Sequence, residues 1–317
     1  MLNYSTHAIE GLLEIRPRLR GAEDKAGMDG FINGVRDAAK FEMPDRGRII
    51  YGLGDMPEGL IMTRLPFPEI VLEIPYTPTD SVKGEMIEAP KRLVLAREVV
   101  WHKQTDYPRP VEYGEAPTHV RVDVAYQNEK DRKWYLQPVG ALVESGAVSG
   151  LFEKNPGVDP FADHRYGGAA FPLMSCPTLP IASSIVLRDN GPQWYAHMVS
   201  NDVGAEVCIL AEMLAVLACA NVTTETRPAP EKLVRNRLKN GREPFYDAHL
   251  LVLAGRVVTA QSGSISISDE EGFKVREHVR RGHIRRLADG RTVWVNHTLV
   301  AAGSKGGRSD KTYSVKG

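Results

Sequence analysis

Arginine and histidine residues are concentrated in one short segment near the C-terminal end of the sequence. Six of the nine residues from His278 to Arg286 are Arg or His, and Gly282 interrupts them. A guanidinium group can donate two parallel hydrogen bonds to a phosphate, and a glycine lets backbone amides approach such an anion closely. Clustered on one loop, such groups predict salt-dependent binding to a nucleic-acid backbone, and a tryptophan ring nearby could stack on an unpaired base. The candidate nucleic-acid-binding residues are Arg276, His278, Arg280, Arg281, His283, Arg285, Arg286 and Trp294.

The same cluster has three other interpretations. It could pair with acidic side chains of the protein itself and act as an internal latch. His278 or His283 could act as general acid and base beside arginines that stabilise a phosphorane, as in metal-independent ribonucleases. A metal site at His278, His283 and His297 is the third, but no cysteine lies nearby and the spacing matches no known ligand pattern. We therefore expect no metal.

The rest of the sequence lacks the motifs of common enzyme classes. It contains neither a phosphate-binding loop nor a zinc-peptidase helix pattern. We assign no catalytic residue and no cofactor, and we expect the protein to act by binding, with cleavage of RNA as the open alternative.

The two parts of the 317-residue chain carry opposite charge. The whole sequence has 40 basic and 40 acidic residues, so its formal net charge is zero. Residues 227–317 contain 18 Lys and Arg against 9 Asp and Glu, which leaves 22 against 31 in residues 1–226. Such asymmetry is typical of chains with a polyanion-binding end. We predict an acidic α+β body (1–226) and a basic C-terminal region (227–317), as two units or packed into a single domain.

The composition is that of a folded protein without disulfides. Apolar residues make up 42% and charged residues 25% of the chain, which excludes wholesale disorder. The three cysteines are too few for a disulfide framework, and two of them lie in the apolar run 207–220. That run is shorter than the roughly 20 residues that a bilayer span needs. With no secretory leader in residues 1–10, we expect a cytoplasmic protein that makes no membrane contact.

Hydrophobic spacing predicts the elements that must position these residues. Apolar residues recur at helical spacing in residues 9–39, with a break at Arg16-Pro17, and the run 207–220 predicts a buried helix capped by Asn201 or Asp202. Residues 118–127 alternate as in a strand with one face in solvent, the face of Asp123, and Glu73 in the strand 70–74 is also expected in solvent. Other strands are predicted at 48–51, 93–101, 245–253, 256–260, 291–296 and 311–315.

Two further segments complete the predicted fold. Residues 150–180 are rich in Gly and Pro and predict a long surface loop. Pro230 and Gly241 bound a second helix, with Lys232, Arg235 and Lys239 on one face. The fold class is α+β, with an antiparallel or mixed sheet packed on a central apolar helix, followed by a basic, mostly-strand C-terminal segment.

The C-terminal sequence contains an R-x-H-x-R-R-G-H stretch (276–283), a basic turn and Trp-centred strand (290–295), and a Lys-Thr-Tyr-Ser-Val ending (311–315). In these features it resembles a family of phage, prophage and plasmid proteins, which includes the type V-A anti-CRISPR protein that lowers production of its target nuclease. Weaker similarity covers residues 65–74 and 236–245. Family members often carry Trp where this chain has Ile284, so a stacking role is not carried over to that position.

The resemblance implies a non-enzymatic or indirectly acting inhibitor. The anti-CRISPR relative recognises the N-terminal segment of the nascent CRISPR effector during translation and triggers loss of its messenger RNA. We therefore expect a phage or mobile-element counter-defence protein. Its expected partners are the nascent N-terminal peptide of a CRISPR effector or another host protein, together with RNA or the ribosome. A metal-independent ribonuclease and a nucleic-acid-binding regulatory module are the alternatives.

Overall fold

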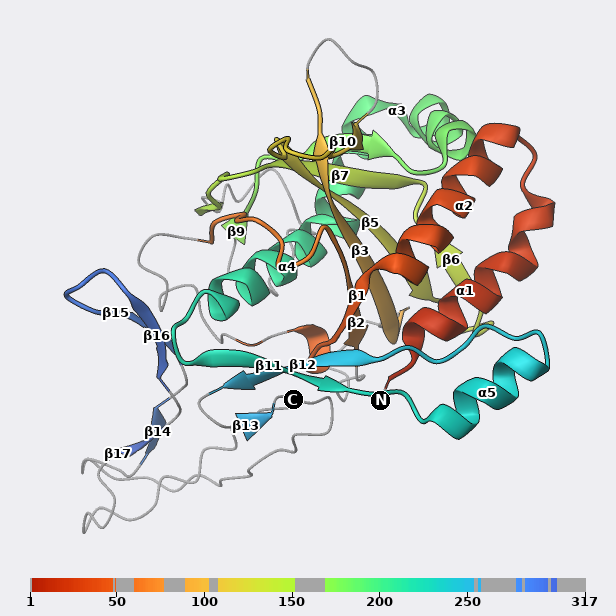
Figure 1. Cartoon of the computed structure of the whole chain (residues 1–317). Coiled ribbons are helices and arrows are strands. Elements are labelled where there is room, and N and C mark those ends of the chain that lie inside the picture. Colours follow the sequence, from red (N-terminus) through yellow and green to blue (C-terminus); the bar gives the residue numbers. More distant parts are fainter. Residues whose placement is uncertain are drawn as a thin grey trace, which may run out of the picture.

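The fold is built on one large mixed β-sheet (Figure 1). The computed structural model describes residues 2–47, 49, 60–76, 89–102, 108–151, 169–253, 256–257, 278–280, 283–295 and 298–300. The strand order is β10 (Met174–Pro177), β7 (Val139–Glu144), β5 (His119–Gln127), β3 (Lys91–Val100), β2 (Glu69–Pro75), β1 (Ala39–Glu42), β12 (Ala248–Leu253) and β11 (Val222–Arg227). Short strands β4 (Arg109–Pro110), β6 (Trp134–Leu136) and β13 (Arg256–Val257) pair with β3, β5 and β12. Strand β1 is parallel to β2 and β12, and the other pairs are antiparallel.

Helices cover both faces of this sheet. Helices α1 (Tyr4–Ile15) and α2 (Ala22–Asp37), joined by the 3-10 turn η1 (Arg16–Arg18), pack on one face, and α4 (Gly204–Leu217) packs on the other (Figure 1). Helix α3 (Pro180–Asp202) contacts β7 and β10 and touches both α2 and α4. The structure thus confirms the predicted α+β class and the central apolar helix, which is α4. The predicted cap of that helix is wrong, because α3 continues through Asp202 and Val203 takes the cap position.

Two hydrophobic cores form because successive strand residues point to opposite faces of the sheet. In β3, Val94 belongs to the core beneath α4, whereas its neighbour Leu95 belongs to the core beneath α1 and α2. Because helices cover both faces of the sheet, the prediction that one face of residues 118–127 lies in solvent is wrong. Asp123 is 0% exposed, and Glu73 in β2 is only 4% exposed.

Several remaining sequence predictions are settled by the described residues. Helix α5 (Glu231–Lys239) confirms the second helix, and Gly241 beyond its end has a positive φ of 64°. The predicted loop 150–180 is wrong at its ends, which form β8 (Gly150–Leu151), β9 (Ala169–Ala170) and β10. Strands β12 and β13 confirm those predicted after α5, although β12 begins only at Ala248. The predicted strands 48–51 and 311–315 lie, except for residue 49, outside the described residues.

Both charge regions of the chain contribute to the same sheet. Strand β11 contains the boundary between residues 226 and 227, and β12 lies between β1 and β11. The three cysteines are free and buried. Of the helices that are described, none is both long enough and apolar enough to cross a bilayer.

Candidate functional site

The described part of the basic segment forms short strands, in agreement with the mostly-strand C-terminal segment that the sequence predicts. Strand β14 (His278–Arg280) pairs with β17 (Thr298–Val300), and β15 (His283–Arg286) pairs with β16 (Thr292–Val295). His278 and Arg280 lie in β14 and His283 lies in β15, while Arg276, Arg281 and His297 lie outside the described residues. The side chains of the predicted site that are described lie on the β15–β16 hairpin.

The register of this hairpin separates an inner face from an outer face. Ile284 lies opposite Trp294, and Arg285 lies opposite Val293. Opposed residues of an antiparallel pair share a face, and successive residues along a strand lie on opposite faces. Ile284 and Trp294 pack against the core beneath α4, so the face of Arg285 is directed away from that core.

Trp294 anchors the hairpin instead of presenting a ring to solvent. Its side chain is 7% exposed. The Trp294 amide donates to the Asn221 Oδ1 (2.6 Å), and the Asn221 Nδ2 donates to the Trp294 carbonyl (2.7 Å). The Ala220 amide adds a bond to the Thr292 carbonyl (2.9 Å). The prediction that Trp294 stacks on a base is therefore wrong, because the ring is used to dock the hairpin at the end of α4.

Two predicted cations remain at the surface of the hairpin. Arg285 and Arg286 are both exposed. Arg285 makes no hydrogen bond or ion pair with the described residues. In the turn, Arg291 pairs with Asp289 at 2.7 Å, but both side chains are at least half exposed, and such pairs contribute little to stability. Hairpin cations of this kind can bind an anion reversibly.

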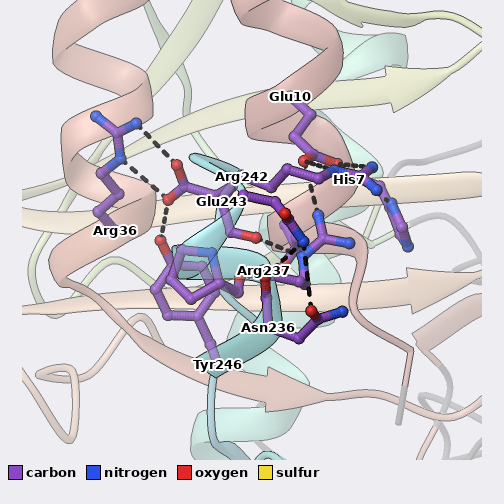
Figure 2. A network of polar contacts seen from close by, with 11 residues as sticks. His7, Glu10, Arg36, Asn236, Arg237, Arg242, Glu243 and Tyr246 are labelled. Atoms are coloured by element: carbon purple, nitrogen blue, oxygen red, sulfur yellow. Dashed lines mark hydrogen bonds and ion pairs between the residues drawn. The ribbon is translucent and has the colours of Figure 1, made fainter. Parts of the chain in front are cut away.

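A second polar cluster, which the sequence did not predict, joins α5 and the residues after it to α1 and α2 (Figure 2). The Arg237 Nη2 donates to the Glu10 Oε1 (2.7 Å), and the Arg237 guanidinium lies 4.5 Å above the Phe245 ring centroid. Arg36 donates two bonds to the Glu243 carboxylate (3.1 and 2.9 Å), which also accepts a bond from the Tyr246 hydroxyl. The partners are 227 and 207 residues apart in the chain, so no local pattern could have indicated them.

This cluster contains residue types that enzymes use, but its groups are already satisfied by one another. Burial would raise the pKa of Glu243, yet the hydrogen bonds from Arg36 and Tyr246 outweigh that effect and lower it. Burial also lowers the pKa of His7, whose Nδ1 lies 4.0 Å from the Glu10 Oε2. Both carboxylates are bonded to arginines, so we assign the cluster the structural role of holding α5 against the body.

The centre of the sheet holds a fully buried carboxylate. Asp123 accepts hydrogen bonds from Arg121 (2.8 and 2.9 Å), Arg97 (2.6 Å) and the Thr178 hydroxyl (2.6 Å). Burial alone would raise the pKa of Asp123, but the two guanidiniums outweigh it and hold the pKa well below its usual range. The group stays ionised and bonded on every side, which suits a structural ion cluster better than a proton-transfer site.

Lys40 in β1 is another buried charged residue. It is 5% exposed, and burial lowers its pKa to about 8. Its Nζ donates to the carbonyls of Arg36 (2.7 Å) and Ala38 (2.6 Å) at the end of α2. A lysine that bonds the last carbonyls of a helix is a common C-terminal cap, so Lys40 is explained by α2.

Neither a metal site nor a match to a known protein adds to this picture. Among the described side chains, no three His, Cys, Asp or Glu lie close enough together to hold a metal ion. Comparison of the chain with protein-family models, curated proteins and solved structures gave no match.

Proposed function

We propose that this protein is a phage or mobile-element counter-defence protein, similar in action to an anti-CRISPR inhibitor. It binds the nascent N-terminal peptide of a CRISPR effector or another host protein, and its basic hairpin contacts RNA of the translating complex. Loss of the target's messenger RNA follows. The proposal is supported by the C-terminal sequence pattern and by the opposite charges of the two parts of the chain.

One observation carries the RNA-binding part of the proposal. The β15–β16 hairpin is fixed to the body through its inner face while Arg285 and Arg286 remain exposed. Because the strand pairing already fixes the backbone, an anion that binds these side chains does not have to order the chain as well. Adjacent strand residues point to opposite faces, so Arg285 is the cation of the outer face, whereas Arg286, also exposed, is in phase with Ile284.

The test is binding of a labelled single-stranded RNA, followed by fluorescence anisotropy at several salt concentrations. We expect Arg285→Glu to weaken binding at least fivefold and to lower the salt dependence by roughly 0.7 per lost phosphate contact. The matched control is Arg188→Glu on α3, an exposed arginine whose ion-pair partner among the described residues is the exposed Asp189. Equal RNA affinity of the two variants would contradict the proposal.

A second assay connects the hairpin to messenger loss. In a translating extract programmed with a target messenger, the wild-type protein should lower the level of that messenger. Arg285→Glu should leave the messenger intact while still co-purifying with the target's N-terminal peptide. Undiminished messenger loss in this variant would separate the hairpin from the function.

The ribonuclease alternative keeps one specific support, since His283 lies in β15 two positions before Arg285. Incubation of purified protein with labelled RNA in EDTA distinguishes it. Cleavage that is lost in His283→Ala favours a metal-independent ribonuclease, whereas intact RNA supports the binding protein.

A further inference from the structure

Strand β11 ends the sheet and is unusually open for a strand of its length. It is the last strand in the order, and it pairs with β12 along all six residues. Four consecutive residues, Thr223 to Thr226, are exposed, so both faces of the strand are in contact with solvent there. Proteins commonly protect such edges with lysines, prolines or bulges, yet these four residues are Thr-Thr-Glu-Thr.

The backbone of β11 presents hydrogen-bonding groups away from the sheet. The Val222 amide donates to the Cys219 carbonyl (3.0 Å), so it does not point toward β12. In an antiparallel pair, the direction of the amide and carbonyl alternates from one residue to the next. The amides and carbonyls of Thr224 and Thr226 are therefore directed outward, and no described strand pairs with them.

Basic elements lie at both ends of this edge. In Figure 1, β11 runs along the lower part of the molecule from the β15–β16 hairpin to α5. The hairpin is joined to the start of the strand through Asn221 and Trp294, and α5 begins four residues after Arg227. Lys232, Arg235 and Lys239 are exposed on α5, whereas Arg237 is the residue that faces the body. Among the described residues, Arg235 is the one of these exposed cations with an acidic partner, Glu231, and that pair is about four-fifths exposed.

We infer that the outer edge of β11 binds an extended acidic peptide by strand addition. The peptide backbone pairs with the outward groups of Thr224 and Thr226, and its carboxylates lie near Lys232 and Lys239 of α5. Main-chain pairing supplies affinity that depends little on sequence, and the cations of α5 select acidic side chains. The inference rests on the proposed function only in that it states where the target peptide binds, and it leaves the hairpin for RNA.

The probe is a fluorescein-labelled ten-residue peptide of alternating valine and glutamate, with the valine–lysine peptide as its matched control. We expect the acidic peptide to bind at least tenfold more tightly than the basic one. Amide hydrogen exchange should slow at Thr224 and Thr226 when the acidic peptide is bound, and should not change at Thr223 or Glu225. Comparable affinity for the two peptides, or no protection at Thr224, would overturn the inference.

Variants of the protein test the main-chain pairing along β11 and the charge contacts with α5 separately. Thr224→Pro removes an outward N–H, a change that an edge strand tolerates, and should lower the affinity for the acidic peptide at least tenfold. Lys232→Glu/Lys239→Glu should lower this affinity by a similar factor, while Arg188→Glu should leave it unchanged. If Thr224→Pro alters the fold, a peptide N-methylated at alternate residues blocks the same bonds from the ligand side and should fail to bind the wild type. Unchanged affinity in these tests would overturn the inference.

The RNA experiment keeps the two proposals distinguishable. If Arg285→Glu lowers RNA affinity but no acidic peptide protects Thr224, the edge assignment is wrong and the proposed function stands. If the acidic peptide protects Thr224 but Arg285→Glu binds RNA normally, the edge assignment stands and the role of the hairpin is wrong.

Discussion

Strands β5 and β11 belong to the same sheet and both mix polar with apolar residues, yet they have opposite environments. In β5, helices cover both faces, and even the charged Asp123 is 0% exposed. In β11, four consecutive residues are exposed. The difference in burial comes from these helices, and the strand order adds to it, since β5 has neighbouring strands on both sides and β11 has one among the described strands. The centre of the sheet therefore provides stability, while no described strand pairs with the outer edge of β11.

The largest effect is expected at Asp123. Asp123→Asn keeps the shape of the side chain but leaves the Arg97 and Arg121 guanidiniums without their counter-charge. Breaking a buried ion cluster in this way costs about 3 to 5 kcal/mol in the free energy of unfolding. Urea denaturation at pH 7 measures it, with Asp289→Asn in the exposed turn as the matched control. A loss below about 1 kcal/mol would contradict the structural role of Asp123.

Asp123 also makes the free energy of unfolding depend on pH. The pKa of Asp123 is lower in the folded protein than its ordinary value of 3.8, so the unfolded chain binds the proton more readily. Its contribution to stability is therefore complete above pH 4 to 5 and is lost as the pH falls through and below 3.8. The wild-type protein should lose more stability between pH 5 and pH 3 than Asp123→Asn does. Parallel acid profiles for the two proteins would rule out this linkage.

The next largest effect is expected where α2 approaches the sheet. A Cβ atom on Gly27 would lie 2.0 Å from the Thr178 carbonyl oxygen, whereas one on Gly30 would meet nothing within 4 Å. Gly27→Ala should therefore destabilise by about 2 to 3 kcal/mol, because the helix must shift. Gly30→Ala in the same helix should instead stabilise by about 0.5 to 1 kcal/mol. Thermal unfolding of the two variants makes the comparison, and equal midpoints would contradict the close approach.

The sequence predicted where helices and strands lie better than it predicted which of their faces are buried. Apolar spacing located α1, α2, α4 and most central strands, because burial against the sheet imposes that spacing on each element. Which faces are covered depends on contacts between distant segments. Residues 118–127 have the alternation of a half-exposed strand, and only the packing of α1 and α2 shows why Asp123 is buried. Strand β11 was not predicted, since Thr-Thr-Glu-Thr has no apolar alternation.

The predicted nucleic-acid site stays a prediction, but one of its details is wrong. Charge counting identified the basic segment, and the described cations Arg285 and Arg286 are exposed. Trp294 was wrongly assigned to base stacking, because its burial depends on Asn221, which is 73 residues away. The cluster of Arg237, Glu10 and Glu243 was missed for the same reason, because Glu10 is 227 residues away from Arg237 in the chain.

Proline substitutions at two neighbouring positions test which amides of β11 point toward β12 and which point outward. The Thr223 amide points toward β12, so Thr223→Pro removes a ladder hydrogen bond and should destabilise by about 1 to 2 kcal/mol. The Thr224 amide points outward, and Thr224→Pro should change stability by less than about 0.5 kcal/mol. Urea denaturation of both variants measures the difference. The reverse order of effects would mean that the register places Thr224 toward β12.

The smallest effect on stability is expected at the cations of α5. Lys232→Glu/Lys239→Glu alters two exposed side chains for which the structure gives no acidic partner among the described residues. Exposed surface charges contribute within about 0.5 kcal/mol, so the unfolding free energy should stay almost unchanged. The same double variant should bind the acidic peptide much more weakly. Asp123→Asn, in contrast, should mainly lower the free energy of unfolding. A double variant that unfolds early would place α5 among the elements that stabilise the fold, and the contrast between sheet centre and edge would then not hold.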